Sequence, residues 1–119
     1  MKLVIALAPL ALAACNFAVP DIATVPDQPT FEEDVKPLFD DHCNLCHGTS
    51  PDRGAPSSFR LDAYDDTPGK RGAASMAGRA VHAVEGDSMP PAASWGDGVG
   101  PNGKKMLQRW IDQGAPRSR

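Results

Sequence analysis

Two cysteines separated by two residues and followed directly by a histidine constrain this chain more than any other feature. The run is Cys43-Asn44-Leu45-Cys46-His47. Two thiols at this spacing can attack the two vinyl groups of a porphyrin. The adjacent imidazole can bind the iron, while its other nitrogen donates to a backbone carbonyl. The run therefore predicts one covalently attached haem c, around which the fold must wrap.

Two other chemistries use the same spacing of cysteines. A dithiol redox site usually accompanies a βαβ pattern, and no such pattern surrounds the run. A structural zinc site needs four Cys or His ligands, and the remaining histidines, His42 and His82, lack the paired spacing of such sites. Haem attachment is the interpretation that the sequence favours.

A second axial ligand to the iron is expected from elsewhere in the chain. Once an export signal is removed, the candidates are Met76, Met89, Met106, His42 and His82. Met76 and Met106 fall on apolar helical stripes, where methionine usually packs in a core, and His42 adjoins the haem-binding run. Met89 lies 42 residues after His47, in a stiff segment with two following prolines. We expect Met89 to be the distal ligand, with His82 as the alternative.

The start of the chain predicts export. Residues 1–14, MKLVIALAPLALAA, contain an early lysine and an apolar stretch that is too short to span a membrane. Leu12-Ala13-Ala14-Cys15 resembles the bacterial lipobox, which predicts cleavage before Cys15 and lipidation of that cysteine. An ordinary signal cut near Ala13 or Ala14 is the alternative. In the bacterial lipoproteins that this segment resembles, a residue other than Asp after the cysteine favours the outer membrane, and Asn16 stands at that position. The resemblance thus implies a lipoprotein on the periplasmic side of the outer membrane, or else a cell-surface or periplasmic protein.

Charge and composition narrow the class of partner. The formal net charge is −3, and no basic patch or nucleic-acid motif is present, so we expect no nucleic-acid binding. The mild negative charge leaves room for a positively charged redox partner. Residues 15–29 contain Pro20, Pro26 and Pro29 and no helical period. They predict a lipid-anchored, proline-rich tether ahead of a folded domain over residues 30–119.

The domain is expected to be all-α, with long irregular loops. Thr30 and Glu33 form a capping-box pattern ahead of the first helix, which should change axis at Pro37 and end at the haem-binding run. Large apolar side chains are few, so we expect the packing to be organised on the faces of the haem.

Two further helices are expected after a long loop. One covers residues 73–85 and is ended by Gly86; the other begins near Pro101 or Asn102, ends at Gly114 and should pack across the first helix. The loop over residues 48–70 has Phe59, Leu61 and Tyr64 as apolar anchors. Its candidate cations for the haem propionates are Arg53, Arg60 and Lys70, joined by the neighbouring Arg71.

Three blocks of the chain resemble the monohaem class I cytochrome c family. The first runs from Phe31 to Phe39 and leads into the haem-binding run; the second comprises Phe59-Arg60-Leu61-Asp62 and Ser88-Met89-Pro90-Pro91. The third is Leu107-Gln108-Arg109-Trp110-Ile111-Asp112-Gln113-Gly114-Ala115-Pro116. The resemblance spans about residues 31–116, although the glycine- and proline-rich middle loop departs from the compact members of the family.

The resemblance implies a small helical cup around one haem, with crossing terminal helices. It implies thioether bonds at Cys43 and Cys46, His47 as proximal ligand and Met89 as distal ligand. We therefore expect a membrane-tethered monomer that transfers single electrons between unidentified redox proteins and transforms no substrate. The alternative is a haem-based gas sensor or a peroxidase-like protein with a labile distal ligand.

Overall fold

The computed structural model describes residues 20–51, 54–91 and 98–119. Its helices, in chain order, are a π-helix η1 over Phe31–Val35, α1 over Lys36–His42, α2 over Asn44–His47, α3 over Ala73–Glu85 and α5 over Gly100–Asp112. In this part of the chain, strand structure is limited to two isolated bridges in the loop before α3. The predicted all-α class is confirmed, and α3 and α5 match the expected ranges closely.

The first helix begins differently from the expected capping box. The Thr30 hydroxyl donates to the Glu33 carboxylate, but the backbone N–H of Thr30 donates to Asp34 Oδ2 at 2.9 Å and not to Glu33. The first turn is π-helical, since the N–H of Lys36 reaches the carbonyl of Phe31. Regular α-helix begins at Lys36, so Pro37 lies in its first turn, where a missing N–H is tolerated.

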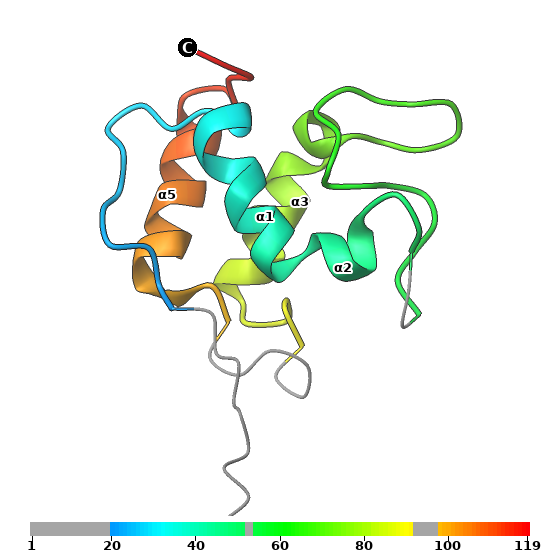
Figure 1. Ribbon diagram of the computed structural model, residues 1–119, viewed down its shortest axis with the longest axis horizontal. Helices are drawn as coiled ribbons and strands as arrows, with labels where there is room; N and C mark the ends of the chain where they lie inside the picture. Colours follow the sequence, from blue (N-terminus) through cyan, green and yellow to red (C-terminus); the bar gives the residue numbers. More distant parts are fainter. Residues whose placement is uncertain (1–19, 52–53, 92–97) are drawn as a thin grey trace, which may run out of the picture.

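The first and last helices lie side by side, as expected (Figure 1). The Trp110 ring of α5 is fully buried between two phenylalanines, with centroids 6.3 Å from Phe31 and 6.2 Å from Phe39. The Trp110 Nε1–H donates to the carbonyl of Pro116 at 3.0 Å, and the N–H of Phe31 donates to the same oxygen at 2.9 Å. The chain end after α5 therefore closes onto the start of η1.

The segment before η1 differs from the expected tether. Residues 21–29 run along α5 (Figure 1), and Pro29 is fully buried. Arg109 of α5 donates to the carbonyl of Pro26 at 3.0 Å, and Gln113 donates to the carbonyl of Asp27 at 2.8 Å. The backbone carbonyls of this segment thus accept hydrogen bonds from the side chains of Arg109 and Gln113. The proline content of the segment does not predict these bonds.

Asp21 holds the beginning of α5. Its carboxylate accepts hydrogen bonds from the N–H groups of Asn102 at 2.9 Å and Gly103 at 3.0 Å. These donors have no partner within the helix, so a carboxylate here satisfies them and complements the helix dipole. Gly100 has a φ of +75°, and a Cβ at this position would collide with the Asp21 carboxyl group. Glycine therefore permits this close approach.

Candidate haem-binding site

The short helix α2 contains Cys46 and His47 of the C-x-x-C-H run, and Cys43 comes directly before it. Cys43 lies between α1 and α2, and its carbonyl accepts from the N–H of Cys46 at 3.1 Å and of His47 at 2.8 Å. Met89 follows α3, where its N–H donates to the carbonyl of Ala83 at 3.2 Å. Cys43, Cys46, His47 and Met89 all line one cavity of about 140 Å³. The tertiary structure thus brings together the four residues that the sequence singled out for haem.

A second cavity of about 290 Å³ adjoins the first, since Cys43, His47, Pro56 and Met89 line both. Its volume approaches the range of about 300–1,000 Å³ found for small-molecule sites. The remaining wall is mostly apolar and comes from α1, the long loop and α3: Phe39, Phe59, Leu61, Met76, Ala80, Ala83 and Val84, with Arg79 as its charged member. Two thiols, an imidazole and a thioether around such an apolar space fit the chemistry of haem c.

His47 is held by the loop that passes beneath it. Its imidazole is buried and stacks on the Phe59 ring, with centroids 4.9 Å apart and an angle of 19° between the planes. The N–H of Leu61 donates to the carbonyl of His47 at 2.7 Å. Burial lowers the pKa of His47, which favours the neutral imidazole that metal binding requires.

One expectation about the His47 ring is not met. Its buried Nδ1 has no hydrogen-bond partner within the described residues, where we expected a backbone carbonyl. The Phe59 ring is thus the observed contact that orients the imidazole face. The sequence predicts Phe59 only as an apolar anchor of the loop, because a contact between residues 12 positions apart in irregular chain leaves no periodic signal.

The environment of Cys43 differs from that of a reactive dithiol. Burial, together with the neighbouring Cys46, raises the pKa of the Cys43 thiol to about 12. Redox-active and nucleophilic cysteines have lowered pKa values in exposed, electropositive surroundings. Both cysteines are free thiols. In the described ranges no three His, Cys, Asp or Glu side chains form a cluster that could hold a metal ion. A haem does not need one, because the porphyrin itself supplies four donor atoms.

The other candidate distal ligands occupy different places. Met106 is buried in the core and His82 is exposed, and neither lines the two cavities. Met76 lines the second cavity from α3. His42, which the sequence analysis set aside, is buried and lines the first cavity with Met89, and burial lowers its pKa. By position, His42 is a closer alternative to Met89 than His82.

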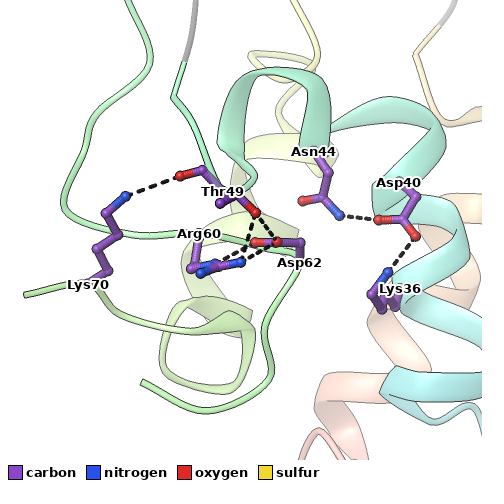
Figure 2. Close-up of polar contacts among 7 residues, drawn as sticks. All are labelled: Lys36, Asp40, Asn44, Thr49, Arg60, Asp62 and Lys70. Carbon is purple, nitrogen blue, oxygen red and sulfur yellow. Dashed lines mark hydrogen bonds and ion pairs between the residues drawn. The ribbon is translucent and has the colours of Figure 1, made fainter. Parts of the chain in front are cut away.

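The candidate cations for the propionates are mostly engaged elsewhere. Arg60 is paired with Asp62, and the Thr49 hydroxyl donates to the same carboxylate at 3.0 Å (Figure 2). Lys70 donates to the backbone carbonyl of Thr49 at 3.4 Å. The backbone of Arg71 pairs with residues 58–60, and its side chain lines neither cavity. Arg53 lies outside the described residues. These contacts close the loop that follows His47.

Arg79 is a charged cavity residue that the sequence pattern did not single out. It lies on α3 and lines the second cavity. A helical wheel could have found it, because positions 76, 79, 80 and 83 share one helix face.

Comparisons with protein-family models, with curated proteins and with solved structures gave no match. No helix in residues 20–51, 54–91 and 98–119 has the length and apolar character needed to cross a bilayer. The predicted signal segment and Cys15 lie outside these residues. A proposal about function therefore rests on the residues that line the two cavities.

Proposed function

We propose that the protein is a one-electron carrier with a single haem c. The haem is attached through Cys43 and Cys46 and is ligated by His47 and Met89. The observation that carries the proposal is the shared cavity. His47 and Met89, 42 positions apart in sequence, both line it together with the thiols of Cys43 and Cys46. When bound, the haem supplies an iron that alternates between the ferric and ferrous states.

The residues of the chain limit what changes during electron transfer. The apolar walls exclude water from the bound group, and Phe59 restrains the His47 ring by stacking on it. The backbone around Met89 is held by Ala83, whose carbonyl accepts from both Ser88 and Met89. Ligands fixed in this way stay attached in both redox states, so little reorganisation is required.

Electron exchange requires an approach to the surface. Met89 is 39% exposed although it lines both cavities, so the distal side of the site reaches the solvent. An exposed edge at this place suits transfer to another redox protein that docks transiently, and no substrate pocket for further chemistry is needed. We propose a monomer that works with redox partners and binds no nucleic acid.

A sensor or peroxidase-like function is the second candidate, and His42 favours it. This buried imidazole lines the cavity with Met89, and its Nδ1 has no hydrogen-bond partner among the described residues. If Met89 left the iron, His42 is the nearby side chain with acid/base capacity. Such a protein would need an open coordination position in its resting state.

An absorption spectrum of the matured protein tests both candidates. The full chain is produced in a host with cytochrome c assembly machinery, and covalent haem is checked by peroxidase staining of a denaturing gel. Oxidised and reduced spectra are then recorded with and without carbon monoxide. A low-spin spectrum with the weak long-wavelength band of methionine-ligated ferric haem, unchanged by the gas, is expected. High-spin bands and ready gas binding would favour the sensor or peroxidase-like function. A protein without haem would exclude both.

We also propose that Cys15 is lipidated and attaches the domain to the periplasmic side of the outer membrane. The lipobox-like residues before it support this proposal. Labelling with radioactive palmitate, followed by membrane fractionation, should show a labelled membrane protein. The Cys15→Ser variant should lose the label and leave the membrane fraction. A native protein found unlabelled in the soluble periplasm would contradict the anchor.

A further inference from the structure

The second cavity has one positively charged wall residue and no negatively charged one. In the described part of the chain, its lining contains Arg79 and no carboxylate, and the first cavity likewise has no carboxylate. The other titratable side chains that line the two spaces are His42, Cys43, Cys46 and His47. A ligand with an acidic substituent would therefore meet a single compensating charge.

Arg79 can reach both the cavity and the solvent. Arg79 is exposed to solvent. Its neighbours on the same face of α3 line the cavity: Met76, Ala80 and Ala83. A long side chain in this position lays its methylene groups along apolar wall and keeps the guanidinium near water. No hydrogen bond or ion pair is found for this guanidinium within the described ranges, whereas Arg60, Arg109, Arg117 and Arg119 are all paired. The Arg71 side chain has no such partner there either, but it lines neither cavity.

We propose that the Arg79 guanidinium binds a carboxylate of the group that fills the cavity. Under the proposed function, on which this inference rests, that carboxylate is a haem propionate. A planar guanidinium matches a carboxylate with two parallel hydrogen bonds, which gives direction as well as charge. Arg79 is thus a positioning residue that fixes the orientation of the group and keeps its acid ionised. Arg60, by contrast, serves the loop through Asp62.

The test uses the full chain with its covalent haem and three variants. Arg79→Gln removes the charge, Arg79→Lys keeps it, and Lys105→Gln removes an equal charge from an exposed position on α5 that lines neither cavity. The reduction potential is measured as a function of pH. An opposite charge nearby lowers a carboxyl pKa by about one unit or more. In Arg79→Gln the propionate inflection should therefore move upward by about one pH unit, whereas Arg79→Lys and Lys105→Gln should keep the native curve.

A measurement on the native protein makes the proposal independent of any variant. In the diamagnetic ferrous form, nuclear Overhauser contacts should link the Arg79 side-chain protons to propionate methylene protons. Covalent haem with an unchanged potential curve in Arg79→Gln, or an assigned Arg79 without these contacts, would overturn the role of Arg79 and leave the proposed function standing. Absence of covalent haem would overturn the proposed function and this inference with it.

Discussion

The Phe59 ring stacks on the His47 imidazole at a centroid distance of 4.9 Å and an angle of 19°. The two residues come from different segments, since His47 ends α2 and Phe59 belongs to the long loop before α3. The loop is secured directly after Phe59, because Arg60 pairs with Asp62 and the N–H of Leu61 donates to the carbonyl of His47. The irregular loop thus has a defined task, which is to restrain the predicted proximal ligand.

Replacing Phe59 by leucine should change how the His47 ring is oriented. The substitution removes the stacked face and costs about 1 kcal/mol of stability, the usual scale for an aromatic pair. The g-value anisotropy of the ferric protein in electron paramagnetic resonance reports the orientation of axial imidazole planes, and it should shift. Tyr64→Phe is the control. Tyr64 lies in the same loop as Phe59, and this substitution removes only the hydrogen bond from its hydroxyl to the carbonyl of Ala115. Identical spectra for Phe59→Leu and native protein would contradict the restraint.

Met89→Ala should open the sixth coordination position. The variant is expected to lose the methionine-ligated ferric band, to show high-spin character and to bind carbon monoxide when reduced. Met106→Leu provides the control, since Met106 is buried in the core away from both cavities and the change nearly conserves volume. If Met89→Ala stays low-spin, a second variant with His42→Ala added identifies the replacing ligand. A native spectrum in Met89→Ala itself would remove Met89 from the site.

Asp21→Ala should destabilise the protein through α5. Two helix N–H groups would lose their acceptor, and the expected loss is about 1 kcal/mol, as for other helix caps. Urea unfolding of the haem-loaded chain, followed by circular dichroism, measures it. Asp27→Ala is the matched control, because its ion pair with Arg109 spans 3.6 Å and its side chain is fully exposed. Equal unfolding midpoints for the two variants would show that Asp21 does not hold α5.

Asp62 should make the protein more stable above pH 4 than below it. Hydrogen bonds from Arg60, with a further one from Thr49, lower the pKa of Asp62 from its ordinary value of 3.8. A carboxyl whose pKa is lower in the folded than in the unfolded state stabilises the fold above the unfolded pKa. That contribution is lost as the pH falls from about 4 through the native pKa. Asp62→Asn should therefore be less stable than native protein at pH 7, and the difference should shrink on acidification.

The control for Asp62→Asn is the same substitution at Asp40 of α1, and Figure 2 shows both carboxylates. Asp40 accepts from Lys36 at 2.7 Å, but both side chains are substantially exposed, at 45% and 39%. Exposed pairs of this kind contribute about 0.5 kcal/mol or less. The unfolding free energies of Asp40→Asn and native protein should thus differ little at any pH between 3 and 7. If this difference changed with pH as much as the difference between Asp62→Asn and native protein, the assignment of the effect to the loop would be contradicted.

The helices were predictable because their signals are local. Residues 73–85 carry an apolar period that ends at Gly86, and the structure has α3 over the same range. The packing of Trp110 against the first helix also followed from its place on an apolar stripe. The capping-box prediction was wrong for both of its hydrogen bonds: the Thr30 hydroxyl donates to the Glu33 carboxylate and caps no backbone N–H, and the N–H of Thr30 donates to Asp34. A sequence pattern does not distinguish the neighbouring carboxylates of Glu33 and Asp34. Their positions in the folded helix decide which of them accepts from the Thr30 N–H.

The sequence by itself determined the chemistry of the candidate site, since the spacing of Cys43, Cys46 and His47 is a property of five consecutive residues. It also determined the helical class through apolar periods. Only the tertiary structure decided which distant groups meet these residues: Met89 and His42 at one cavity, Phe59 on the His47 ring, and Arg79 on the wall. It likewise decided that residues 21–29 lie on α5. The physical reason is that an irregular loop or a proline-rich segment has no period, so its position depends on the donors and apolar surfaces it finds in the folded chain.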